Sequence, residues 1–341
     1  MKLRSLATSI AFAALMASGA QADCNPNVKD EASTANFPHL TGKLFYTTWS
    51  IDVYGRRILD TGQIAYYDFA SGTNVPISQP SWKTSGHIVD ILNPVLSADE
   101  HWVLFMANTN DQAWNIYMYR LGSNTLPVNL TNSVGATRNE DPKFSADQTK
   151  VVFKRTQNGA SDIEVGNLAW ASGNPYFTSY GNYTHNPAGV ESSMPFYSTD
   201  PAWIYYTIGS GDNLQVYYRS VNGGTDNHFD GTSQIKAYYP IVRNDYHVNY
   251  ARWHDAASML DQIYQKNALT ATPIELSFND CNSNNSDPAP VNGTSLTFFS
   301  STENGRYELF LGDAVTGQRW NMSLFGLNSD TGRAYVGAYY Q

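Results

Sequence analysis

The sequence predicts an all-β fold, a six-bladed β-propeller of four-stranded antiparallel blades, on the strength of an internal repeat. Five segments share a proline, an apolar strand, a turn and further apolar strands, and the prolines lie at positions 94, 142, 195, 240 and 288. The distances between these prolines are 48, 53, 45 and 48 residues. Four strands in a unit of roughly 40–50 residues are typical of a propeller blade.

Each blade is expected to begin near its proline, with blades starting near residues 37, 93, 141, 194, 239 and 287. Apolar runs after the turns predict the second strands, at residues 43–51, 102–107, 150–155, 203–208, 247–253 and 295–301. The third strands are predicted at residues 62–70, 114–121, 162–168, 214–221, 261–267 and 307–313. Each fourth strand is shorter, as at residues 126–131 and 318–324.

A strand-like tail at residues 333–341 is predicted to close the ring. Its Ala338-Tyr339-Tyr340 resembles Ala237-Tyr238-Tyr239 in the repeat. Propellers remove an open sheet edge by letting one end of the chain complete the blade of the other. We therefore expect the tail to complete the first blade.

Composition excludes several classes of protein. The chain has 341 residues, of which 42% are hydrophobic and 15% are charged, and its formal net charge is −9. The charged fraction lies well below the roughly 25% usual for soluble globular proteins, which excludes a solvated disordered chain. The acidic balance, without a cluster of Lys and Arg, argues against nucleic acid or an anionic membrane as a partner.

The first 22 residues have the pattern of a secretory signal peptide. Lys2 and Arg4 precede an apolar stretch at residues 6–17, and Ala20-Gln21-Ala22 is a small-x-small cleavage site. The stretch is shorter than the roughly 20 residues that a membrane span needs, and no later segment is longer. We expect a secreted or periplasmic protein, cleaved after Ala22, with residues 23–341 as a single propeller domain.

Cys24 and Cys281 are the only cysteines. Two cysteines of an exported protein usually pair, so a Cys24–Cys281 disulfide is predicted. A catalytic thiol is the alternative, but no Cys-His pattern supports it.

The repeat resembles that of the TolB-type propellers. The best copy runs from Asp141-Pro142-Lys143-Phe144-Ser145-Ala146-Asp147 to the strand Val151-Val152-Phe153 and then Asp162-Ile163. The chain departs from the pattern in lacking Gly after most turn aspartates, as at Glu100 and Gln148, and it lacks the small domain that precedes the propeller in TolB. The resemblance implies the architecture and leaves function open, since TolB-like propellers serve as protein-binding scaffolds and as polysaccharide lyases.

Carboxylates near the blade prolines are the first candidates for chemistry. Asp141 and Asp287 precede prolines of different blades, and Glu140 and Glu191 lie close by. Two carboxyl groups that meet at the channel mouth would supply the acid and the base of glycoside hydrolysis. The alternative is that an Asp before Pro is part of the repeat and only holds the start of the strand.

Cations on neighbouring blades are the second candidates. Arg138, Arg155 and Arg252, with Trp253 and Tyr238 beside them, would bind an anionic sugar. Lys154, Arg243 and His254 lie near the same strand ends. The alternative is that these cations pair with the surplus of acids.

A uronate lyase would also need a base to remove a proton next to the sugar carboxylate. The candidates are His87, Tyr238, Tyr239 and His254. Asn93 occupies the corresponding pre-proline position of another blade, where it would bind substrate.

Loops and metal ligands give weaker signals. Residues 169–189 carry aromatic side chains among Gly, Asn and Ser, which suits sugar stacking, a protein partner, or a loop folded over its own rings. The seven histidines show no metal-binding spacing. A Ca²⁺ site built from residues 280–287 is the one cofactor candidate.

Two functions follow from these patterns. The first is a secreted, carbohydrate-active propeller that binds, and by lyase or hydrolase chemistry cleaves, a polysaccharide or oligosaccharide at the channel mouth. The alternative is a non-catalytic scaffold that holds a periplasmic protein. A channel mouth with clustered charge favours the first, and a plugged channel with an apolar rim favours the second.

Overall fold

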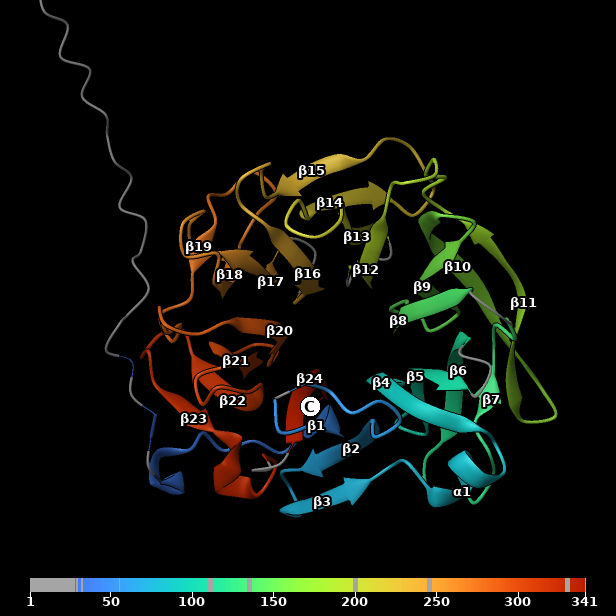
Figure 1. Cartoon of the computed structure of the whole chain (residues 1–341), viewed down its shortest axis with the longest axis horizontal. Coiled ribbons are helices and arrows are strands. Elements are labelled where there is room, and N and C mark those ends of the chain that lie inside the picture. The colour runs from blue at the N-terminus through green and yellow to red at the C-terminus, as the bar shows by residue number, and fades with distance from the viewer. Residues whose placement is uncertain are drawn as a thin grey trace, which may run out of the picture.

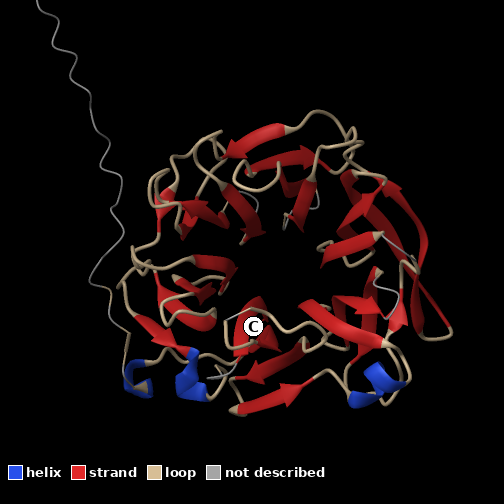
Figure 2. Ribbon diagram, in the orientation of Figure 1, coloured by secondary structure: helices blue, strands red, loops and turns tan. Residues whose placement is uncertain are grey.

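The computed structural model describes residues 28, 30–31, 33–54, 56–109, 113–133, 137–198, 202–243, 247–328 and 332–340. Strands dominate this part of the chain (Figure 2). Its helical elements are the short helix α1 (Pro80–Thr84) and two 3₁₀ turns, at Thr34–Asn36 and Met322–Phe325. Within these residues no helix is both long and apolar enough to cross a membrane. The signal peptide predicted at residues 1–22 lies outside the described residues.

The strands form antiparallel sheets of four, each ordered from an inner to an outer strand. The first sheet has the order β24 (Gly332–Tyr340), β1 (Lys43–Ser50), β2 (Gln63–Asp68) and β3 (Thr73–Pro76). The second set is β4 (Ile88–Leu96), β5 (Trp102–Thr109), β6 (Trp114–Arg120) and β7 (Val128–Asn129). The third set is β8 (Arg138–Phe144), β9 (Lys150–Gln157), β10 (Ala160–Ala171) and β11 (Asn174–Asn182). A single bridge between Trp114 and Arg138 joins the second and third sets into one eight-stranded sheet.

Three further four-stranded sheets follow in chain order. The first of them is β12 (Ser192–Tyr197), β13 (Trp203–Ile208), β14 (Gln215–Ser220) and β15 (Asn227–Asp230). The next is β16 (Ala237–Val242), β17 (Val248–Trp253), β18 (Asp261–Lys266) and β19 (Ile274–Glu275). The last is β20 (Asn285–Pro290), β21 (Leu296–Ser301), β22 (Glu308–Asp313) and β23 (Arg319–Asn321).

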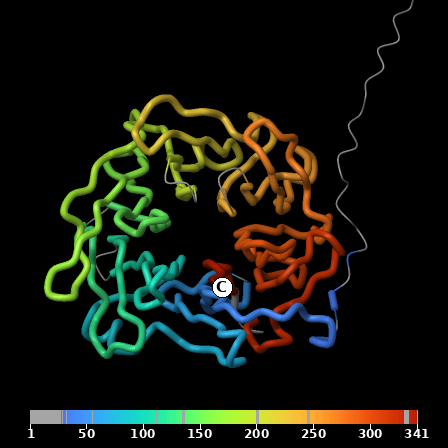
Figure 3. Tube along the Cα trace, turned by 180° about the vertical axis from the view of Figure 1, so that it is seen from behind, coloured from blue at the N-terminus to red at the C-terminus, as the bar shows by residue number. Residues whose placement is uncertain are grey.

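The sheets are arranged around a common centre, with one inner strand of each facing it (Figures 1 and 3). Neighbouring inner strands contact one another in the order β24, β4, β8, β12, β16, β20 and again β24. Neighbouring sheets cover both faces of most strands. Buried residues therefore run almost continuously along a strand, as in Trp114–Arg120. The hydrophobic core therefore lies between the sheets rather than in one central mass.

The residue before each repeat proline has an unusual backbone. Positive φ angles between 51° and 55° occur at Asn93, Asp141, Met194, Tyr239 and Asp287. The pairing of each inner strand with its neighbour shifts register at this point. Bulges of this kind bend a strand and redirect a side chain. Asn and Asp tolerate such angles, whereas Met and Tyr adopt them rarely.

The predicted closing strand is present as β24, which pairs along β1 from Lys43 to Ser50. Gly337 lies at the register shift of this pair, and a Cβ there would be 2.9 Å from the carbonyl oxygen of Pro94, so only glycine fits. Residues 338–340 resemble residues 237–239 in sequence but do not occupy the equivalent position in their strand. The register shift of β24 comes before Ala338, whereas that of β16 comes after Tyr238. The first repeat was expected to begin near residue 37, but Phe37-Pro38 form no strand, because β24 takes the inner position of that sheet.

The segment at residues 169–189 is not the loop that its composition suggested. Most of it belongs to the hairpin of β10 and β11, in which eight residue pairs match across the two strands. Phe177 packs flat against Phe153 with 5.9 Å between ring centroids, and this contact holds β11 on the core. Alternating polar and aromatic residues therefore reflect an outer strand with one exposed face.

Candidate functional site

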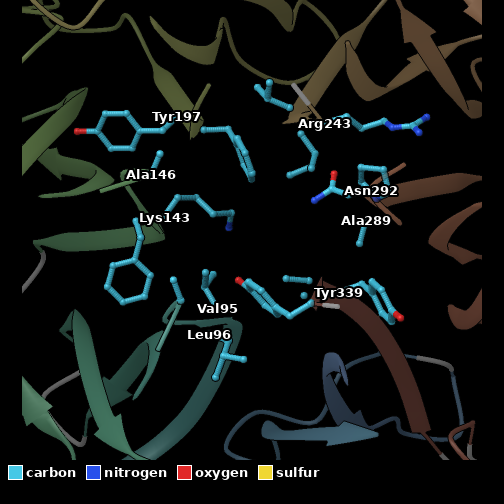
Figure 4. Close-up of a pocket in the computed structure, with 18 of the residues that line it drawn as sticks. Val95, Leu96, Lys143, Ala146, Tyr197, Arg243, Ala289, Asn292 and Tyr339 are labelled. Atoms are coloured by element: carbon cyan, nitrogen blue, oxygen red, sulfur yellow. The ribbon is translucent and has the colours of Figure 1, made fainter. Parts of the chain in front are cut away.

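A cavity of about 470 Å³ lies at the centre of the ring. Its walls come from the C-terminal halves of all the inner strands and from the turns that follow them (Figure 4). Most of the wall is apolar, including Val95, Leu96, Ile241, Pro288 and Ala289. We call this cavity the central pocket.

Lys143 is the one charged side chain that Figure 4 shows pointing toward the middle of the central pocket. Only 5% of the residue is exposed, and its Nζ has no hydrogen-bond partner among the described residues. Burial lowers the pKa of this amine, while the charges of Asp141 and Asp287 act in the opposite direction. The guanidinium of Arg243, on the rim, points away from the middle and donates to the carbonyl oxygen of Thr294.

Lys143 was missed as a functional candidate, although the repeat contains the signal. The residues after the other repeat prolines are apolar: Val95, Phe196, Ile241 and Ala289. A lysine at a position that is otherwise apolar in every copy stands out once the copies are aligned.

Four of the predicted site residues lie beside Lys143: Asn93, Asp141, Tyr239 and Asp287. We call these five residues the central cluster. Asn93 donates from Nδ2 to Oδ1 of Asp141, and the Nζ of Lys143 lies 5.8 Å from the centre of the Tyr239 ring. The charges of Asp287 and Asp141 both act on the Tyr239 hydroxyl, whose pKa is raised mainly by burial. The pre-proline residues of three repeats, Asn93, Asp141 and Tyr239, and Asp287 of a fourth therefore lie within electrostatic reach of one another.

The two carboxyl groups of the central cluster are hard to ionise. Burial raises the pKa of Asp287 to about 6, although Ser286 donates to it from 2.8 Å. Burial also raises the pKa of Asp141, and the neighbouring charge of Glu140 adds to the effect. Neither Asp141, Asp287 nor Tyr239 lines the central pocket, so a ligand in that pocket does not touch them.

The predicted acids and cations at the N-terminal ends of the inner strands are paired with one another. Arg138 donates from Nε to Glu140 over 3.1 Å. Lys154 lies 3.4 Å from Glu140 and 2.6 Å from Glu191. These four residues form an ion-pair network, as the pairing alternative predicted, and they leave no set of unpaired cations for an anionic sugar at this place.

The predicted residues of the fifth repeat also have partners. Arg252 lies 3.3 Å from Asp230, and the Tyr238 hydroxyl donates to Asp261 over 2.9 Å. Trp253 is buried, with 7% of the residue exposed. None of Tyr238, Arg252 and Trp253 lines the central pocket.

His87, Arg155 and His254 lie apart from the central cluster. His87 is exposed in the turn before β4, with a φ of 55°. Arg155 donates to the Tyr180 hydroxyl over 2.7 Å, on the outer hairpin of the third set. His254 contacts Glu275 over 2.8 Å.

Cys24 lies outside the described residues, so its disulfide with Cys281 stays a prediction. In the candidate Ca²⁺ segment, Asp280 accepts hydrogen bonds from Asn282 and from Ser283, within the turn that it forms. Over the described ranges, no group of three or more His, Cys, Asp or Glu side chains is placed to hold a metal ion.

Comparison with known proteins shows the fold. No family model and no curated protein sequence matches the chain. Among solved structures, TolB from Acinetobacter baumannii superposes with a TM-score of 0.67 and 15% identity, over 89% of this chain and 67% of that one. A TolB described as putative, from Agrobacterium tumefaciens, gives a TM-score of 0.55 and 14% identity, over 89% of this chain and 100% of that one.

Enzymes are also among the similar structures. A puromycin hydrolase mutant gives a TM-score of 0.55 at 12% identity, over 76% of this chain but only 41% of that one. The chain therefore has a TolB-type propeller fold, and likeness at this identity carries the fold alone.

Proposed function

We propose that the chain is a secreted, six-bladed propeller that serves as a non-catalytic scaffold and binds an apolar segment of a partner protein in the central pocket. In this proposal β24 closes the ring, and the Cys24–Cys281 disulfide fastens the mature N-terminus to the last repeat. The signal pattern at residues 1–22 supports export.

The observation that carries the scaffold proposal is the character of the central pocket. Its walls are largely apolar, the side chain of Lys143 points into its middle, and the acids predicted to be catalytic do not line it. Apolar walls favour an apolar ligand, because each Å² removed from water contributes about 25 cal/mol. Largely apolar walls that lack the predicted acids support a scaffold over a polysaccharide enzyme.

The size of the pocket favours a short segment over a broad protein surface. A volume of about 470 Å³ is typical of pockets that enclose a few side chains. Polar side chains also line the pocket, among them Asn292 and Gln148, where they would bond to peptide groups of an extended chain. We therefore expect one or two apolar side chains of the partner to enter the pocket.

Binding of short peptides tests this proposal. The probes are fluorescent eight-residue peptides of Ala and Ser with a central Leu, Phe, Trp or Asn, measured by fluorescence polarisation. We expect Leu, Phe or Trp peptides to bind and the Asn peptide to bind about tenfold more weakly or worse.

A rim variant and a matched control locate the binding. Ala146→Trp places a large ring at the exposed mouth of the pocket and should abolish binding. Ala256→Trp makes the same change at an exposed position away from the pocket and should leave binding intact. Equal behaviour of the two variants, or no preference for apolar peptides, would contradict the proposal.

Polysaccharide cleavage by Asp141 and Asp287 stays a prediction with its own test. The protein is incubated with neutral and uronic polysaccharides, and reducing ends and unsaturated uronates are measured. Product that the unaltered chain forms and the Asp141→Asn variant does not form would contradict the scaffold proposal and indicate an enzyme.

A further inference from the structure

A second cavity, of about 370 Å³, lies between the second and third sets of strands. Its floor is apolar and includes Met118 and Leu168, and its edge carries Trp102, Trp170 and the turn acids Asp99 and Asp147. We call it the tryptophan cavity. It shares Ser97, Phe144 and Gln148 with the central pocket, but the function proposed for that pocket does not use the two tryptophans.

The two indole rings make one continuous aromatic wall. Their centroids are 4.9 Å apart and their planes are inclined by 56°. Trp102, at the start of β5, is half-buried, whereas 48% of Trp170, near the end of β10, is exposed. The rings are too close together for a ligand to enter between them, so a ligand would lie against their outer faces.

The two acids occupy the same position in consecutive repeats. Ser97 donates to Asp99 over 2.5 Å, and Ser145 donates to Asp147 over 2.6 Å, within their respective turns. These hydrogen bonds are the largest influence that lowers the pKa of each acid, so both are ionised at neutral pH.

Both carboxylates keep capacity to accept further hydrogen bonds. A carboxylate offers about four acceptor sites. In each turn the donors gather mainly on Oδ1. Oδ2 of Asp99 lies 3.5 Å from Nδ1 of the exposed His101, and Oδ2 of Asp147 accepts, among the described residues, from Thr149 over 3.0 Å. Both side chains are exposed at the edge of the cavity, within reach of a bound molecule.

We propose that the tryptophan cavity binds a pyranose unit of a saccharide that carries no acidic group. The C–H face of the sugar ring packs on Trp170 and Trp102, and its hydroxyls donate to Asp99 and Asp147. An aromatic wall with a few convergent polar groups is the general composition of a small-molecule site. Two ionised carboxylates repel a uronate, so the ligand class differs from the anionic sugar predicted from the sequence.

The experiment measures binding of defined oligosaccharides to the full mature chain. Cellohexaose, maltohexaose and chitohexaose are the probes without an acidic group, and hexagalacturonate is the acidic one. Binding is followed by calorimetry and by tryptophan fluorescence. We expect at least one of the first three to bind and to change the fluorescence, and hexagalacturonate not to bind.

Variants then assign the site. Trp170→Ala should weaken binding about tenfold or more, and Trp170→Phe should restore part of it. Asp147→Asn, which keeps the shape of the side chain, should weaken binding about threefold or more. The matched control is Tyr176→Ala, which removes an exposed ring from the same hairpin but not from the cavity, and it should bind like the unaltered chain.

Three results would overturn the proposal. One is that none of the three oligosaccharides without an acidic group binds. Another is that Trp170→Ala and Tyr176→Ala have the same effect. The third is that tetramethylammonium competes at the same residues and binds more tightly than any sugar, since two indoles beside two carboxylates would then form a cation site.

Discussion

Glu140 and Asp141 are neighbours in the chain, yet the structure moves their pKa values in opposite directions. Arg138 and Lys154 hold the pKa of Glu140 below its ordinary value despite burial. Burial raises the pKa of Asp141, although Asn93 donates a hydrogen bond to its carboxyl group. The comparison teaches that the pKa of a buried acid depends on its partners in space, and some of them, such as Lys154 and Asn93, are distant in the sequence.

The two regions should respond differently to loss of a charge. In the ion-pair network, removal of one partner leaves another charge buried and unpaired, which costs several kcal/mol. In the central cluster, neighbouring groups compensate only part of the free-energy cost of burying a charge. Removal of a charge there also removes that cost.

The largest effect is expected for Lys154→Met. It leaves Glu140 and Glu191 without their shared cation, only 14% of whose side chain is exposed. We expect the free energy of unfolding to fall by about 3 kcal/mol at pH 7, measured by urea denaturation. The loss should shrink as the pH falls through the lowered pKa of Glu140, because the acid is then neutral in both states. A change below about 1 kcal/mol at pH 7 would remove the distinction between the two regions.

Asp287→Asn should have the opposite sign. Because the pKa of Asp287 rises from 3.8 to about 6 on folding, the native state binds more protons between these values, and stability declines as the pH rises through them. Above pH 6 the cost reaches at most about 3 kcal/mol, at about 1.4 kcal/mol per pKa unit. We expect the variant to gain about 1–3 kcal/mol at pH 8 and nothing at pH 3.5, measured by thermal unfolding at both pH values. A variant less stable at pH 8 would show that the carboxylate has stronger partners than described.

Lys143→Met separates charge from volume within the central cluster. The ammonium lowers the pKa of Asp141, so its removal should raise that pKa further. Relief of the buried, unpartnered cation offsets this cost, and the stability at pH 7 should change by only about 1 kcal/mol. Carboxyl NMR titration measures the pKa, and an unchanged midpoint for Asp141 would contradict the arrangement.

The smallest effect is expected for Arg138→Gln. Its side chain is 48% exposed, so water screens its pairing with Glu140. We expect a loss of about 0.5 kcal/mol in urea denaturation at pH 7, far below that of Lys154→Met. Equal losses in the two variants would mean that exposure does not separate the members of the network.

The regular part of the fold could be predicted from sequence because its signals are local. Proline spacing and apolar runs place β5, β9, β13, β17 and β21 within about two residues. The sequence singled out Asn93 and Asp141 as equivalent positions of the repeat, but the hydrogen bond between them comes from the structure.

What sequence could not supply is information about partners. Arg138 and Arg252, on the third and fifth repeats, are cations in either interpretation, and only the fold shows that Glu140 and Asp230 neutralise them. Trp102 and Trp170 lie on different strand sets, so their shared wall has no local signal. Lys143 stands out only when the residues after the repeat prolines are compared, and not when the residues before them are compared.

The pairing of β24 with β1 also fixes an order of events. The ribosome produces β1 among the first strands of the ring and β24 after all the others. Until β24 emerges, the inner edge of β1 has no strand to pair with and is open to any other chain. A chain that ends before Gly332 would therefore leave this edge unpaired and open to aggregation.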